Sequence, residues 1–258
     1  MVKKIVGTGV LLVLALALQA GVKMYTLKSP DGKVKLEVTA GQGIAYSLFY
    51  DGRLLLKPSR IALHTDLPEA DHWENIRITG TKQRHVSETV QAPFYRVKEF
   101  GIDCNELELR LNNGFSLLMR AYNDGMAYRF VAGRKGEMTV VEERAEFNFA
   151  DDFEAYIPYS TNPKDPWNMA FQNFYTKAPL TQYNTELPAF LPLTVDAGAV
   201  KLTLLESDLE AYPGMFVRGD GKTPALKGVF AAYPQETFKN KWRCQETVKT
   251  RRPYIARG

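Results

Sequence analysis

The chain has 258 residues, which is enough for one large domain behind a leader or for two small domains. A hydrophobic content of 45% and an aromatic content of 12% exclude a disordered protein, because such a chain buries a substantial core. The net charge of +4 comes with no dense basic patch beyond Lys249, Arg251 and Arg252 at the very end, so composition gives no support for a nucleic-acid-binding surface.

The first 20 residues resemble a secretory leader rather than part of the fold. Lys3 and Lys4 precede an apolar run from Val10 to Leu18, and Ala20 supplies a small residue for cleavage. That run is shorter than the roughly 20 residues that span a bilayer. We therefore predict a signal peptide over residues 1–20, a secreted or periplasmic protein, and no membrane span after cleavage.

The next segments alternate between apolar and polar residues, as half-buried strands do. The segments predicted before the centre of the chain are two strands within 22–38 around a turn at 29–32, a strand at 44–50, an apolar run at 54–63, a polar loop at 67–75 and strands within 77–91. This spacing indicates a succession of antiparallel hairpins.

Residues 106–131 show the most regular alternation in the chain. Asn112-Asn113-Gly114 and Asn123-Asp124-Gly125 interrupt it with residues that tolerate the positive φ of tight hairpin turns. We predict a three-stranded antiparallel meander here. Arg120 and Arg129 lie on its wetter face, where they either pair with Glu142 or Glu143 of the following strand or contact a sugar or a partner.

Residues 151–177 interrupt the strand pattern. Three prolines there exclude a long regular strand or helix. The segment also carries the aromatic residues Trp167, Phe171, Phe174 and Tyr175. A long loop of this kind is functional or packs on a partner.

Further strands follow this loop. They are predicted at 189–195, 199–205, 215–219 and 226–233, with a turn-rich connection at 206–215. No segment carries a sustained helical period. The chain is therefore predicted to be all-β, a large antiparallel two-sheet sandwich.

Several of these segments resemble one known family. They are LKSPDGKVKLEV at 27–38, RAYNDGMAYRF at 120–130, LPLTV at 191–195, LLESDLEAYPGM at 204–215 and RPYIARG at 252–258. Together they resemble the N-terminal domain of glycoside hydrolase family 97, exported bacterial α-glucosidases and α-galactosidases. The resemblance implies a galactose-mutarotase-like β-super-sandwich over residues 22–250, followed at 251–258 by the start of a linker to a (β/α)8 catalytic barrel.

In that family the barrel carries the catalytic carboxylates, so the resemblance implies no catalytic residue in this chain. It also implies a calcium ion at the active site, with one ligand from the aromatic loop, where the matching position is Gln172. An amide oxygen ligates calcium but brings no charge. The expected partners are the barrel and an α-linked oligosaccharide. An alternative is a stand-alone sandwich that binds a carbohydrate without cleaving it.

Two kinds of residue are candidates for sugar contact. Trp167 and Tyr175 either stack on a sugar ring or seal the domain against the barrel, because both tasks use aromatic rings with a polar edge. Glu206 either binds sugar or fixes the geometry of the 206–215 turn. Cys104 and Cys244 either form a disulfide or remain two separate thiols, and neither has metal-type spacing.

Overall fold

The computed structural model describes residues 23–167, 172–207, 209, 212–239 and 246–258. These residues form antiparallel strands and one short 3-10 turn, Leu180–Gln182. The predicted all-β class is therefore confirmed. The signal peptide, Phe171 and Cys244 lie outside the described residues. No helix in the described part of the chain is long and apolar enough to cross a membrane.

The largest sheet, the long sheet, runs in the order β1-β2-β3-β4-β9-β15-β14. Its strands are β1 (Lys23–Lys28), β2 (Val34–Gly41), β3 (Gly43–Tyr50), β4 (Arg53–Thr65), β9 (Thr139–Asn148), β15 (Ala225–Phe230) and β14 (Met215–Gly219). A short strand, β18 (Ala256–Arg257), also pairs with β9. Part of the segment expected to begin a linker thus belongs to this sheet.

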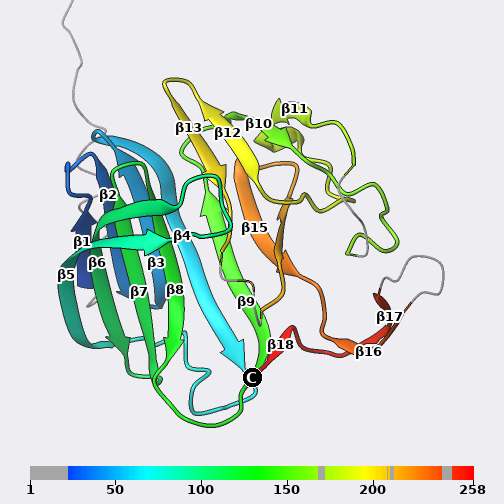
Figure 1. Cartoon of the computed structure of the whole chain (residues 1–258), viewed down its shortest axis with the longest axis horizontal. Coiled ribbons are helices and arrows are strands. Elements are labelled where there is room, and N and C mark those ends of the chain that lie inside the picture. Colours follow the sequence, from blue (N-terminus) through cyan, green and yellow to red (C-terminus); the bar gives the residue numbers. More distant parts are fainter. Residues whose placement is uncertain (1–22, 168–171, 208, 210–211, 240–245) are drawn as a thin grey trace, which may run out of the picture.

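Opposite the long sheet lies the meander sheet, which has the order β5-β6-β7-β8 (Figure 1). Its strands are β5 (Ile78–Gln91), β6 (Glu99–Leu111), β7 (Phe115–Tyr122) and β8 (Gly125–Ala132). The last three are the meander predicted from the alternation, with turns at the predicted Asn-Gly and Asp-Gly positions. The two sheets form the predicted sandwich.

A third, small sheet has the order β11-β10-β12-β13 and lies beside β15 (Figure 1). Its strands are β10 (Glu154–Ile157), β11 (Thr176–Pro179), β12 (Leu193–Ala197) and β13 (Val200–Leu204). A hairpin of β16 (Pro234–Lys239) and β17 (Glu246–Arg251) stands apart from all three sheets. The segment between β10 and β11 is the loop rich in proline and aromatic residues.

The core lies between the long sheet and the meander sheet. In β7 every second residue is buried, so Phe115, Leu117, Met119 and Ala121 point inward. Tyr46 of β3 and Tyr128 of β8 meet across the sandwich with ring centroids 5.9 Å apart. Full burial of a side chain such as Leu117 or Met119 contributes about 1.5–3 kcal/mol. The alternation in the sequence is therefore the physical cause of the two layers.

The loop at 67–75, predicted to be polar, contributes a buried aromatic side chain to the core. Trp73 is only 5% exposed, and its indole nitrogen donates a hydrogen bond to the carbonyl oxygen of Leu63 at 2.9 Å. Its ring lies 5.2 Å from that of Phe130 in an edge-to-face arrangement. One aromatic residue thus anchors a polar loop onto the end of the sandwich.

Candidate functional site: an aromatic segment and an acid–tyrosine cluster

The predicted site residues lie on two connections between strands. Trp167, Gln172 and Tyr175 belong to the segment between β10 and β11, and Glu206 follows β13. Gln172 is exposed, and Tyr175 is 49% exposed. Phe174 between them is 90% exposed. The aromatic segment therefore presents ring surface to solvent instead of burying all of it.

Trp167 differs from these exposed neighbours because its ring packs on strand β14. The ring lies edge-on to Phe216, with centroids 5.0 Å apart, and Phe216 packs against Phe190 at 4.8 Å. Nearby, Asp165 and Arg251 form an ion pair of 3.5 Å that joins the segment to the β16–β17 hairpin. Trp167 is half-buried, so its outer edge still contributes to the surface.

Glu206 closes the 206–215 connection on itself. Its Oε2 atom accepts a hydrogen bond of 2.7 Å from the backbone N–H of Met215. A Cβ atom added at Gly214 would lie 3.3 Å from Oε1, so glycine lets the turn approach the carboxylate closely. Burial raises the pKa of Glu206, although the Met215 N–H favours its charged form. The geometry matches the turn-fixing alternative.

Next to this turn lies an acid–tyrosine cluster that the sequence analysis did not identify as a site. The Tyr212 hydroxyl donates a hydrogen bond of 2.7 Å to Oε2 of Glu143 on β9. Burial raises the pKa of Glu143, the hydroxyl of Tyr212 opposes that shift, and the charge of Glu206 adds to it. The hydrogen bond therefore fastens the 206–215 connection to the long sheet.

The expected pairing of Arg120 with Glu142 or Glu143 is wrong. Arg120 pairs instead with Glu106, at 2.8 Å, because the β6–β7 register places these two residues directly opposite each other. Arg84 of β5 completes the group, with its Nε atom 2.6 Å from Glu106. Glu143 lies on a strand of the other sheet, so the arginine that looked close in sequence is not its partner.

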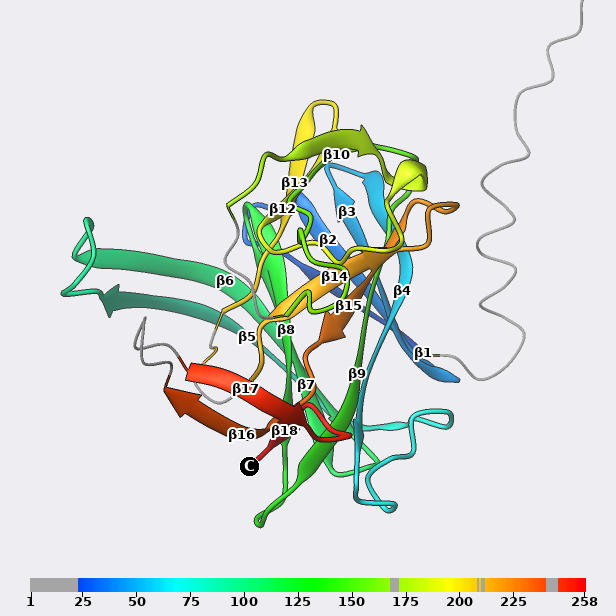
Figure 2. The ribbon, with the colours of Figure 1, turned by 90° about the vertical axis from the view of Figure 1, so that its right-hand side faces the viewer.

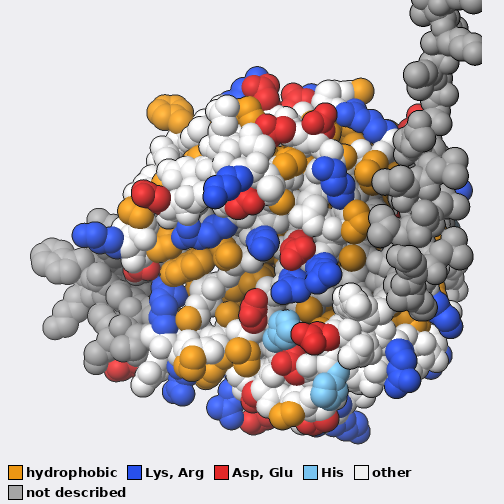
Figure 3. Space-filling view, turned by 180° about the vertical axis from the view of Figure 1, so that it is seen from behind, with side chains coloured by type: hydrophobic (Ala, Val, Ile, Leu, Met, Phe, Trp, Pro, Cys, Tyr) orange, Lys and Arg blue, Asp and Glu red, His pale blue; other side chains and the backbone are white. Residues whose placement is uncertain are grey.

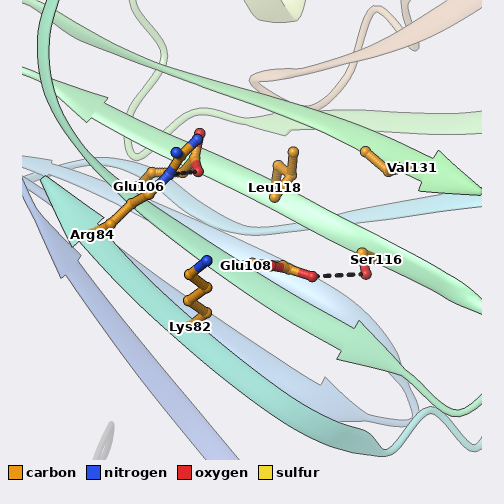
Figure 4. A pocket seen from close by; sticks show the side chains of 7 residues that line it. All are labelled: Lys82, Arg84, Glu106, Glu108, Ser116, Leu118 and Val131. Atoms are coloured by element: carbon orange, nitrogen blue, oxygen red, sulfur yellow. Dashed lines mark hydrogen bonds and ion pairs between the residues drawn. The ribbon is translucent and has the colours of Figure 1, made fainter. Parts of the chain in front are cut away.

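This arginine–glutamate group borders a shallow hollow of about 300 Å³ on the outer face of the meander sheet (Figure 4). The hollow is lined by Lys82, Arg84, Glu106, Glu108, Ser116, Leu118 and Val131. Its acids are engaged by neighbouring side chains, because Glu106 binds two arginines and Glu108 accepts from Ser116 at 3.3 Å. The hollow is therefore an open surface depression with engaged charged side chains rather than an enclosed ligand pocket.

The contacts of the histidines do not follow from their neighbours in the sequence, and the described cysteine is unpaired. His72 alone adjoins acids in sequence, yet His64 contacts Asp71 at 2.7 Å and His85 contacts Asp103 at 3.1 Å. Cys104 is a buried free thiol, and burial raises its pKa. Within the described ranges, no group of three or more His, Cys, Asp or Glu side chains is placed to hold a metal ion.

A family model described as glycosyl-hydrolase 97 N-terminal matches residues 27–252 of the chain. A retaining alpha-galactosidase of Bacteroides thetaiotaomicron is 38% identical over 250 residues, which cover 94% of this chain and 37% of that protein. A probable retaining alpha-galactosidase of Streptomyces bingchenggensis is 26% identical over 158 residues, or 60% of this chain and 24% of that protein. The chain thus spans well under half the length of these curated relatives.

Solved structures agree on the fold. A glycoside hydrolase family 97 enzyme from Pseudoalteromonas sp. strain K8, in complex with acarbose, aligns with a TM-score of 0.67 at 18% identity and covers 80% of this chain and 32% of that one. A beta-arabinopyranosidase aligns with a TM-score of 0.68 at 20% identity, covering 80% and 35%. At these identities the likeness shows the fold alone.

Proposed function

Because the chain belongs to the glycosyl-hydrolase 97 N-terminal family, we propose that it forms the non-catalytic β-sandwich part of an α-glycosidase. The observation that carries this proposal is its 38% identity, over 94% of its length, to a retaining alpha-galactosidase that extends well beyond the match. The remainder of such an enzyme would hold the catalytic (β/α)8 barrel. Glycoside hydrolysis needs two carboxylates flanking the scissile bond. Here Glu143 and Glu206, which share the acid–tyrosine cluster, are occupied by donors of the chain itself.

The substrate class follows from the same relative. We propose an α-linked galactoside, cleaved with retention, ahead of an α-glucoside, because both curated relatives carry the name alpha-galactosidase. This chain would contribute a wall of the active site and not the reacting groups. Its exposed ring surface at Phe174 and Tyr175 is of the kind that domain interfaces bury.

The described residues of this chain offer few ligands for the calcium ion that the family implies. Calcium takes six to eight oxygen ligands. Gln172 is exposed and offers one neutral amide oxygen, and the described residues hold no acidic cluster around it. The residues described therefore do not fit a calcium site on their own. We propose that Gln172 supplies at most one ligand to a site completed by the second domain. We likewise propose export through the leader at 1–20.

The test compares two proteins made in parallel, namely the 258-residue chain and the product of the complete reading frame. p-Nitrophenyl α-galactoside and α-glucoside are assayed with each. We expect turnover from the complete product, faster on the galactoside, and none from the 258-residue chain. Turnover by the purified 258-residue chain refutes the non-catalytic role. Tight oligosaccharide binding to this chain, with no downstream barrel in the reading frame, supports the stand-alone binding module instead.

A further inference from the structure

The β5–β6 hairpin continues past the sandwich as a free arm. Its strands pair with each other from Ile78 and Leu111 to Gln91 and Glu99. Strand β7 pairs with β6 only up to Cys104, so no other strand of the described residues lies beside the outer part of the hairpin. Figure 2 shows this arm projecting well away from the rest of the fold.

The tip of this arm, residues 91–100, is strongly apolar for a solvent-exposed hairpin. Phe94 is fully exposed, Tyr95 is 65% exposed and Val97 is 52% exposed. Val90 and Phe100 at its base are 41% and 40% exposed, and the Tyr95 and Phe100 rings lie 5.7 Å apart. Such a cluster on an arm marks a surface that another molecule or domain covers.

The tip is also a turn with defined backbone hydrogen bonds. The backbone N–H of Ala92 donates to the carbonyl oxygen of Lys98 at 2.7 Å, and that of Tyr95 donates to Ala92 at 3.1 Å. These bonds hold the rings outward in a defined turn. A two-stranded hairpin by itself is only marginally stable in water. An apolar tip is therefore expected to gain its stability from the surface that it contacts.

We propose that this tip docks on the catalytic domain of the same polypeptide, an inference that rests on the proposed function. Figure 2 shows the arm and the β16–β17 hairpin projecting toward the same side of the molecule. The two hairpins thus extend from the same face, where a neighbouring domain would contact both. Over the opposite face, acidic, basic and hydrophobic side chains are interspersed (Figure 3).

Size and connectivity favour a domain of the same polypeptide over a second copy. The match covers 37% of the relative, which leaves room for a large domain. A domain tethered by a short linker has an effective concentration in the millimolar range, so it outcompetes a free second copy. Burial of the Phe94 and Tyr95 rings of the tip would remove at most roughly 300–500 Å², at about 150–250 Å² per ring. The rest of an interdomain interface, which totals about 600–1,500 Å², would come from other contacts between the two domains.

The experiment follows hydrogen exchange of residues 92–98 in the 258-residue chain and in the complete product. We expect the tip amides to exchange at least tenfold more slowly in the complete product, and trypsin to cut after Arg96 and Lys98 only in the shorter chain. Docking should also slow hydrogen exchange at the surface of the second domain that the tip contacts. The triple variant Phe94→Ser, Tyr95→Ser, Val97→Ser abolishes that protection. Met24→Ser, which changes a side chain 57% exposed on β1, is the control and leaves that protection unchanged.

Three results overturn the inference, and each is distinguishable from the others. Equal exchange at the tip in both proteins, with a second domain present, refutes the docking and leaves the proposed function standing. A reading frame without a second domain ends both proposals. A 258-residue chain that is dimeric by light scattering, and becomes monomeric in the triple variant, assigns the tip to a second copy instead.

Discussion

Replacing Glu106 with glutamine should destabilise the domain by removing the charge that two arginines share. Glu106 is 5% exposed and lies 2.6 Å from Arg84 and 2.8 Å from Arg120. Removing one member of a buried ion pair costs about 3–5 kcal/mol, because it leaves a buried charge uncompensated. The side chain of Arg84 is 54% exposed and water screens it. We therefore expect a smaller loss, about 2–3 kcal/mol.

Urea unfolding followed by circular dichroism measures this loss. For a domain of this size the corresponding fall in Tm is about 5–10 °C. The control is Glu108→Gln, on the same face of β6, because Glu108 accepts only a hydrogen bond of 3.3 Å from the neutral Ser116 hydroxyl within the described residues. We expect that control to change the stability by less than about 1 kcal/mol. Equal losses in the two variants would refute the reasoning.

The pH dependence gives a second check on the same residue. The hydrogen bond from Arg84 holds the pKa of Glu106 below its ordinary value of 4.5, against the effect of burial, and Arg120 adds to this lowering. A lowered carboxyl pKa means that the stabilisation is present above pH 4.5 and is lost as the pH falls through the folded-state pKa. The stability difference between wild type and Glu106→Gln should therefore shrink in acid. A difference that is constant from pH 7 to pH 3 would contradict the ion-pair account.

Three further predictions concern the core, the acid–tyrosine cluster and the aromatic segment. Leu117→Ala, at a position with no exposed surface, should cost about 2–5 kcal/mol in urea unfolding, whereas Leu118→Ala on the outer face should cost less than about 1; the reverse order would refute the assigned faces. Burial raises the pKa of Glu143 above 4.5, so its ionisation weakens the fold as the pH rises. The stability of Glu143→Gln relative to wild type should therefore increase between pH 4 and pH 7, and a pH-independent difference would contradict the burial. Calorimetry of the 258-residue chain should show no tight calcium binding; one-to-one uptake lost in Gln172→Ala would show a complete site in this chain.

The local hairpins were predictable because their cause is local. Alternation at 106–131 and the turns at 112–114 and 123–125 fix the meander without reference to other segments. Residues 77–91 were expected to hold several strands around Gly80, but they form one long strand, β5, with a register shift between Ile78 and Gly80. An added Cβ at Gly80 would lie 2.6 Å from the Arg110 guanidinium, a contact that only the paired sheet creates.

The site was less predictable because its partners come from distant strands. Glu143 and Tyr212 are 69 positions apart, and neither alternation nor turn chemistry indicates that they meet. The pairing of Glu106 with Arg120, in contrast, could have been derived from the turn at 112–114, since this turn sets the β6–β7 register. The sequence analysis singled out the aromatic segment for its prolines and rings. The structure then shows that Trp167 packs on Phe216 while Phe174 stays exposed.

The sequence by itself determined the strand class, the meander and the family resemblance, because period-two alternation, turn residues and motif spelling are properties of neighbouring residues. The tertiary structure alone decided which charges pair across strands and which apolar residues remain outside. Strand order brings β9 beside β4 and β15, and β6 extends beyond the end of β7, and neither fact is written in any local pattern. The exposed tip at 91–100 follows from that geometry, since an apolar residue counts as core only where another layer covers it.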